Sequence, residues 1–184
     1  MNRMTITSVV AILFCIAGWC WGAEPGPNYE HLKFFEGYVG TWSISATLEE
    51  DTPFGKKGDV GSASITWKWD YSKNVVDWRW KFNFSGKWSG TKGTMTWDPI
   101  QKKAVGAGVS SDGGMIRVTE RSTNPLTFYV EFVGPDGNKS SQVETFTLVD
   151  NDTVTTKATE RIGLPAPGDS PEFTFKRVRN EKVK

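Results

Sequence analysis

Hydrophobic and polar residues alternate along most of the chain, a pattern typical of β-strands that bury one face. After Gly40, the residues Trp42, Ile44, Ala46 and Leu48 alternate with polar ones. A hairpin is predicted over residues 62–84, and further strands near residues 87–97, 102–110, 114–121, 126–133, 140–149, 153–161 and 172–179. Clusters of Asp, Asn, Gly and Pro separate these stretches and indicate turns. The pattern therefore predicts about ten short antiparallel strands.

The hairpin over residues 62–84 predicts its own register. A turn at residues 71–74 would pair Trp67 with Trp78, Ile65 with Trp80, Ala63 with Phe82, Lys68 with Asp77, Thr66 with Arg79 and Ser64 with Lys81. One face of the hairpin is then apolar and the other polar. A slip by one residue would expose several aromatic rings at once, so we expect this register to be firmly fixed, with the aromatic face buried.

Only one helix is predicted. Asn28 is a good N-cap residue, and Leu32 and Phe35 share one helical face. A meander of strands leaves two unpaired edges, which closure into a barrel removes. We therefore predict an all-β fold, an antiparallel up-and-down β-barrel of about ten strands with one short N-terminal helix. A sandwich of two sheets is the alternative. The irregular stretch at residues 163–171 is interpreted as a loop.

The start of the chain has the pattern of a secretory signal peptide. Arg3 precedes a short apolar run, Val9–Gly18, and small residues before Ala23 suit cleavage there. A membrane-spanning helix would need ~20 apolar residues, so an uncleaved anchor is the weaker alternative. We expect residues 1–22 to be a signal peptide, residues 23–184 to form a single domain, and the protein to be secreted or periplasmic without a membrane anchor.

Cysteine, histidine and charge limit the chemistry. Cys15 and Cys20 both lie in the predicted signal peptide, so the mature chain would hold no disulfide, thiol nucleophile or cysteine ligand. Removing Arg3 with that segment lowers the net charge from +1 to zero, and no nucleic-acid partner is expected. His31 is the single histidine, which disfavours a catalytic triad, a closed zinc site and haem. No metal or cofactor is predicted.

Several motifs follow one another in an order that resembles a known family. They are Gly40-Thr41-Trp42 at the first strand, Gly93-Thr94-Met95-Thr96-Trp97-Asp98-Pro99, Ser111-Asp112-Gly113-Gly114, Asp136-Gly137, Asp150-Asn151-Asp152-Thr153 and a closing strand that ends in Arg. This order resembles a bacterial family of exported lipocalin-like domains of unknown function, in the calycin superfamily. The resemblance covers residues 28–179 and implies a barrel with an internal cavity, but no activity.

The resemblance also implies a structural closure. In calycin barrels the signature tryptophan closes one end and packs under an arginine of the last strand, which assigns Gly40 and Trp42 to this role. Arg177 shares a strand face with Phe173 and Phe175 and is the candidate arginine. Arg179 has the same parity and remains the alternative.

One acidic residue and several glycines are candidates for chemistry. Glu144 shares a strand face with Phe146 and Leu148 and is the best candidate for an acid inside the barrel. A change of register, or a partner such as Lys139, would equally explain an acid on this apolar face, so no catalytic residue is assigned. The glycines at positions 106, 108, 113 and 114 lack the context of a phosphate loop and are interpreted as turn and bulge residues.

The aromatic residues carry the remaining functional signal, because the chain has 9 Trp. We expect the ligand-binding residues to be Trp67, Trp78, Trp80 and Phe82, facing the lumen around a small apolar ligand. A two-residue turn after Phe84 would place Trp88 outside. The expected function is that of an exported binding or accessory protein. The alternatives are an enzyme that uses acids in the lumen, an extracellular carbohydrate- or protein-binding module, and a barrel filled by its own side chains.

Overall fold

The computed structural model describes residues 24–47, 56–84, 86–164 and 169–179. The predicted signal peptide, residues 1–22, lies outside the described residues, as do residues 48–55. Within the described ranges, no helix has the length and apolar character needed to cross a membrane.

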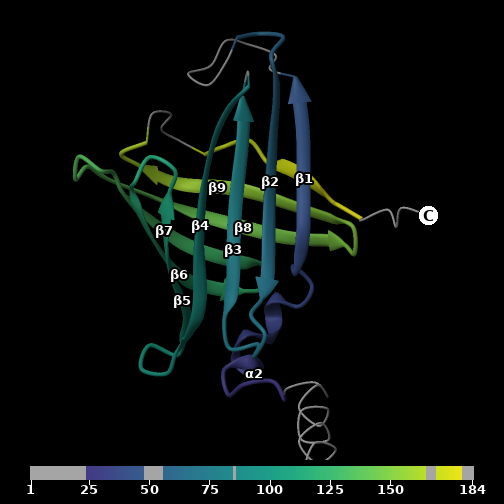
Figure 1. Cartoon of the computed structure of the whole chain (residues 1–184), viewed down its shortest axis with the longest axis vertical. Helices are drawn as coiled ribbons and strands as arrows, with labels where there is room; N and C mark the ends of the chain where they lie inside the picture. Colours follow the sequence, from purple (N-terminus) through teal and green to yellow (C-terminus); the bar gives the residue numbers. More distant parts are fainter. Residues whose placement is uncertain (1–23, 48–55, 85, 165–168, 180–184) are drawn as a thin grey trace, which may run out of the picture.

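Ten strands follow one short helical segment. The chain forms α2 (Tyr29–Leu32) and the 3-10 turn η1 (Lys33–Phe35), and then β1 (Gly40–Thr47), β2 (Val60–Trp69), β3 (Val76–Phe84), β4 (Lys87–Asp98), β5 (Lys103–Ser110), β6 (Met115–Thr123), β7 (Leu126–Val133), β8 (Lys139–Asp150), β9 (Thr153–Ile162) and β10 (Phe173–Arg177). Each strand pairs with its neighbours in sequence, and β1 pairs with β10, so the sheet is closed. The predicted all-β, ten-stranded antiparallel up-and-down barrel is confirmed, and the sandwich is wrong (Figure 1).

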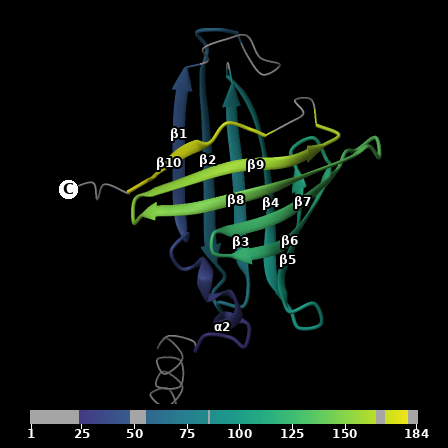
Figure 2. The ribbon, with the colours of Figure 1, turned by 180° about the vertical axis from the view of Figure 1, so that it is seen from behind.

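The barrel has two walls whose strands run in different directions. In Figure 1, β1–β4 run along the long axis of the molecule, and β7–β9 cross behind them. Figure 2 shows the reverse view, in which β8, β9 and β10 lie in front. In both views α2 lies at the lower end of the barrel. The barrel closes at the β1–β10 seam through two pairs, Trp42 with Arg177 and Ser43 with Lys176.

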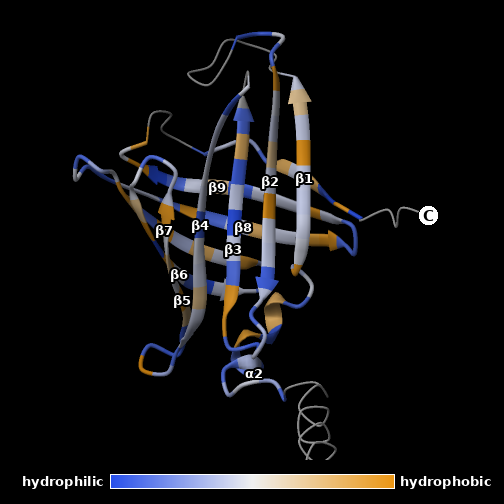
Figure 3. Ribbon diagram, in the orientation of Figure 1, coloured by the Kyte–Doolittle hydropathy of each residue, from blue (hydrophilic) through white to orange (hydrophobic). Residues whose placement is uncertain are grey.

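The hairpin of β2 and β3 has the predicted register. Trp67 is opposite Trp78 and Lys68 is opposite Asp77, as are all the other predicted pairs. Figure 3 shows hydrophilic and hydrophobic positions alternating along β3. Phe84 pairs with Lys87 across the next turn, and Trp88 is accordingly 68% exposed on the outside.

The helical segment closes one end of the barrel. The side chains of Leu32 and Phe35 are fully buried, as their shared helical face predicted. The ring of Phe35 lies 6.0 Å from that of Phe128 and 6.5 Å from that of Trp67. Tyr38 Oη donates a hydrogen bond of 3.2 Å to a backbone carbonyl oxygen of β8. These contacts make the segment a plug at this end of the barrel.

Asn28 lies at the predicted N-cap position of α2, and its carbonyl oxygen accepts the N–H of Leu32, but its side chain does not cap the helix. Asn28 has helical backbone angles. Its Nδ2 donates to Oγ1 of Thr96 at 3.2 Å, and its backbone N–H donates to Oδ1 of Asn74 at 3.1 Å. Asn28 instead fastens the helix to β4 and to the turn before β3.

Two of the glycines interpreted as turn or bulge residues were misassigned. Gly106 and Gly108 lie inside β5, where the pairing with β4 is regular. A Cβ atom at Gly108 would come within 2.7 Å of Cζ2 of Trp78, and one at Gly93 on β4 within 2.5 Å of the same atom. The indole of Trp78 therefore lies directly against the backbone of two strands, which only glycine allows.

Candidate functional site

The three residues that the resemblance assigned to barrel closure, Gly40, Trp42 and Arg177, lie together at the β1–β10 seam. The Trp42 ring is fully buried, and Cζ of Arg177 lies 4.0 Å from its centroid. The indole N–H of Trp42 donates to the carbonyl oxygen of Tyr38 at 2.8 Å. Gly40 has a φ of +133°, and a Cβ atom there would lie 2.6 Å from Nη1 of Arg177. Glycine is thus needed at this position both for its backbone conformation and for the space it leaves.

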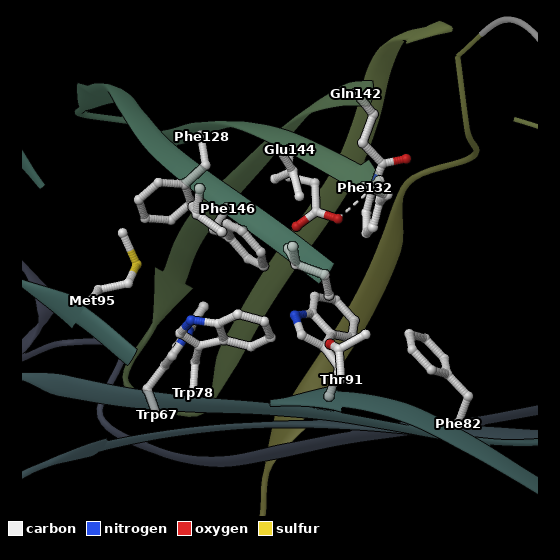
Figure 4. Close-up of a pocket in the computed structure, with 14 residues that line it drawn as sticks. Trp67, Trp78, Phe82, Thr91, Met95, Phe128, Phe132, Gln142, Glu144 and Phe146 are labelled. Carbon is white, nitrogen blue, oxygen red and sulfur yellow. Dashed lines mark hydrogen bonds between the residues drawn. The ribbon is translucent and has the colours of Figure 1, made fainter. Parts of the chain in front are cut away.

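A cavity of about 150 Å³ lies in the lumen, between the plugged end and the opposite mouth (Figure 4). Trp67 on β2 and Trp78, Trp80 and Phe82 on β3 all line it, so the structure brings together the four residues predicted for ligand binding. The remaining lining residues are Thr91, Met95, Ile116, Val118, Phe128, Val130, Phe132, Gln142, Glu144 and Phe146. A cavity of this size has room for a ring of about six non-hydrogen atoms.

The aromatic rings form a continuous set around this space. The ring of Phe146 lies 5.0 Å from that of Trp67, 6.1 Å from that of Trp80 and 6.1 Å from that of Phe128. The rings of Trp80 and Phe82 are stacked at 5.5 Å. Rings at these separations and orientations support one another's positions, so the walls of the cavity are held in place before any ligand arrives.

Glu144 places one carboxyl group in these apolar surroundings. Figure 4 shows the group pointing into the cavity, toward the wall that carries Trp67 and Trp78. Nε2 of Gln142 donates a hydrogen bond to Oε1 of Glu144. Burial raises the pKa of Glu144 to about 7, and the bond from Gln142 only partly offsets this effect. The acid is therefore near its half-protonated state at neutral pH.

The sequence offered Lys139 as a possible charged partner for Glu144. Lys139 is exposed at the start of β8 and forms no ion pair with Glu144 in the described part of the chain. No other carboxyl group lines the cavity among the described residues. A search of those residues found no group of three or more side chains able to hold a metal ion. His31 is exposed, its ring is stacked on that of Trp97 at 4.4 Å, and neither ring lines the cavity.

Several lining residues were missed from the sequence, most clearly Gln142, Phe128 and Phe132. Gln142 lies two residues before Glu144 and so shares its strand face, which is a signal that parity alone could have supplied. Phe128 and Phe132 alternate with polar residues on β7 in the same way. That these two rings line the same cavity as Trp78 could not be predicted from the sequence, because it depends on which strands face each other across the barrel.

The outer face of the β2–β3 hairpin carries charged side chains. Lys68, Asp77 and Arg79 are exposed there, as predicted. Arg79 is directly opposite Lys92 on β4, so two cations face each other across neighbouring strands. Trp88 and Val109 border a shallow groove beside them. This face and the lumen are separated by the sheet.

Comparison with known proteins gives no further guide to the site. The chain matches no model of a known protein family, and a search of curated proteins returned no similar sequence.

Proposed function

We propose that this protein is an exported β-barrel that binds a small, mostly apolar ligand in its lumen and serves as a binding or accessory protein. The observation that carries the proposal is the cavity of about 150 Å³, lined by aromatic and aliphatic side chains with one acid and one amide among them. Preformed apolar cavities with a few convergent polar groups are the usual form of a small-molecule site. Lipocalin-like barrels of the kind that the sequence resembles hold ligands in the same place.

The alternatives have less support. Hydrolysis by paired carboxylates needs a second acid, and Glu144 is the single carboxyl group among the described residues of the lining. A carbohydrate platform needs a row of exposed rings, and Trp88 is the one exposed tryptophan in the described ranges. A barrel filled by its own side chains would leave no cavity of this size.

Binding of 4-fluorotoluene, followed by ¹⁹F NMR with tryptophan emission recorded in parallel, tests the proposal. We expect saturable binding that weakens in Trp80→Ala, because its ring forms part of the cavity wall. Trp78→Phe should also change the affinity, since Trp78 lines the same space.

The matched controls are Lys68→Ala and Arg79→Ala, which alter the outer face of the same two strands. They should leave the affinity unchanged. No saturable binding by the folded protein would contradict the proposed function, and a loss of binding in the control variants would place the site on the outer face.

A further inference from the structure

The lumen contains an acid with one hydrogen-bond partner among the described residues. Glu144 accepts one hydrogen bond, from Gln142, although an ionised carboxylate has about four acceptor positions. The other described lining residues supply only the hydroxyl of Thr91 and the indole N–H groups as further polar atoms. Since a buried charge without partners is costly, a ligand that satisfied this carboxylate would gain binding free energy that a purely apolar ligand would not.

The rings around Glu144 favour a positive charge as well. Trp67, Trp78 and Trp80 present indole rings to the cavity, and Phe128 and Phe146 add phenyl rings. Aromatic faces attract cations, most strongly when the site is shielded from water, and tryptophan does so best. No lysine, arginine or histidine of the described residues lines the cavity, so the protein supplies no cation of its own there.

We propose that the ligand of this site is a small organic ammonium ion, held with its charged nitrogen beside Glu144 and its alkyl groups against the surrounding indole and phenyl rings. The inference rests on the proposed function and names its ligand class. The cavity volume limits the cation to a compact group such as a methylated ammonium head. Neither a fatty acid nor any other anion suits this lining, because its charge would oppose that of Glu144.

The groups that face Glu144 are otherwise uncharged. Its neighbour across β7 is Phe128 and its neighbour across β9 is Ala158. From β2, β3 and β4 the facing side chains are aromatic, apart from Thr91 and Met95, and from β6 they are Ile116 and Val118. Arg161, further along β9, does not line the cavity. Among the residues that the structure describes, Glu144 is therefore the one titrating group that a ligand in this cavity would meet.

This arrangement makes binding depend on pH in a direction that reveals the ligand's charge. In the empty cavity the pKa of Glu144 is about 7, and a bound cation would lower it, so binding would release a proton. Affinity for a cation should then rise as the pH rises through 7. A neutral ligand that accepts a hydrogen bond from protonated Glu144 should show the opposite trend.

Calorimetric titration with choline and with its neutral isostere 3,3-dimethyl-1-butanol tests the proposal, because the two probes share a shape and differ in charge. We expect choline to bind about tenfold or more tightly at pH 8.5 than at pH 5.5, and more tightly than the isostere at pH 8.5. Glu144→Gln should abolish the pH dependence and reduce the preference for choline to the part that the aromatic rings provide. Glu131→Gln is the matched control, because Glu131 is an exposed acid on the adjacent strand β7.

The outcomes separate this inference from the proposed function. Equal affinity for both probes, or tighter binding of the isostere, overturns the ammonium ligand and leaves a lumenal site in place. Failure of choline, the isostere and 4-fluorotoluene alike overturns the proposed function itself. If Glu144→Gln does not fold, wild-type protein titrated with choline at pH 7 in two buffers of different ionisation enthalpy decides the matter, since proton release supports the cation and its absence contradicts it.

Discussion

The Cζ atom of Arg177 lies over the indole of Trp42, 4.0 Å from the ring centroid. Its Nη1 and Nη2 atoms donate hydrogen bonds of 2.7 and 2.9 Å to the carbonyl oxygens of Val39 and Gly37, and its Nε atom donates to that of Asn151 at 2.6 Å. One side chain of the last strand thus holds the chain segment that leads into the first strand.

Replacing Trp42 with Ala should lower the free energy of unfolding by about 3–5 kcal/mol, because the ring is fully buried and leaves a cavity. Arg177→Ala should cost less, about 1–3 kcal/mol, since its side chain is partly exposed. Urea unfolding of both single variants and of the double variant measures their coupling. Additive losses would contradict the stack, whereas we expect a coupling of at least about 0.5 kcal/mol.

The stability of the protein should fall as the pH rises from about 4.5 to 7. The folded-state pKa of Glu144, about 7, lies above its ordinary value, so the folded state binds the proton more tightly than the unfolded chain does. This contribution is complete below the unfolded pKa, is lost as the pH rises through the folded pKa, and amounts to about 3 kcal/mol at most. Urea unfolding at a series of pH values should show this loss.

Glu144→Gln is the test of that assignment, because it removes the titration and keeps the shape of the side chain. Its stability should change less than that of the wild type between pH 4.5 and 7. A variant that loses as much stability as the wild type over this range would show that other groups cause the pH dependence.

Gly108→Ala should destabilise the barrel by about 1–3 kcal/mol, because the new Cβ would meet Cζ2 of Trp78 and the backbone of β4. The smaller ring of Trp78→Phe should recover part of this loss, which a thermal unfolding series of the single and double variants would measure. If the loss is the same in both backgrounds, contact with the indole is not its cause.

Lys92→Glu should stabilise the protein by about 0.5 kcal/mol, because it turns the like-charged pair with Arg79 into an attractive one. Lys87→Glu is the control for net charge, since its cross-strand partner is Phe84. Added salt should reduce the gain at position 92. An equal gain from both variants would assign the effect to overall charge instead.

The mature protein should begin near Ala23 and contain no thiol, because both cysteines precede that residue. Intact mass spectrometry of protein isolated from its native compartment measures this directly. A mass that includes Cys20, free or lipidated, would contradict the predicted cleavage and the expected route of export.

Strand positions and the β2–β3 register could be predicted from the sequence because each depends on local alternation. The pairing of Trp67 with Trp78 follows from which residues form the turn, and the exposure of Trp88 follows from the short turn after Phe84. Closure of the barrel was also predictable, since ten antiparallel strands without closure would leave two open edges.

Contacts across the lumen could not be predicted in the same way. Whether Glu144 meets Lys139 or an aromatic lining depends on the closed shape of the sheet and not on any local pattern. The side-chain partner of Asn28 and the role of Gly108 were not foreseen for the same reason. Asn28 is bonded to Asn74 and Thr96, and Gly108 accommodates Trp78, so each depends on a residue far away in sequence.

The seam between β1 and β10 has two paired positions, whereas β2 and β3 share nine. Local opening of a protein begins where the fewest interactions must be broken, so backbone amides at Ser43 and Lys176 should exchange with solvent before those of the β2–β3 hairpin. Opening of this seam must break the contacts of Arg177 with the Trp42 ring and with the carbonyl oxygens of Val39 and Gly37. The strength of these contacts therefore sets how often the barrel opens at the seam.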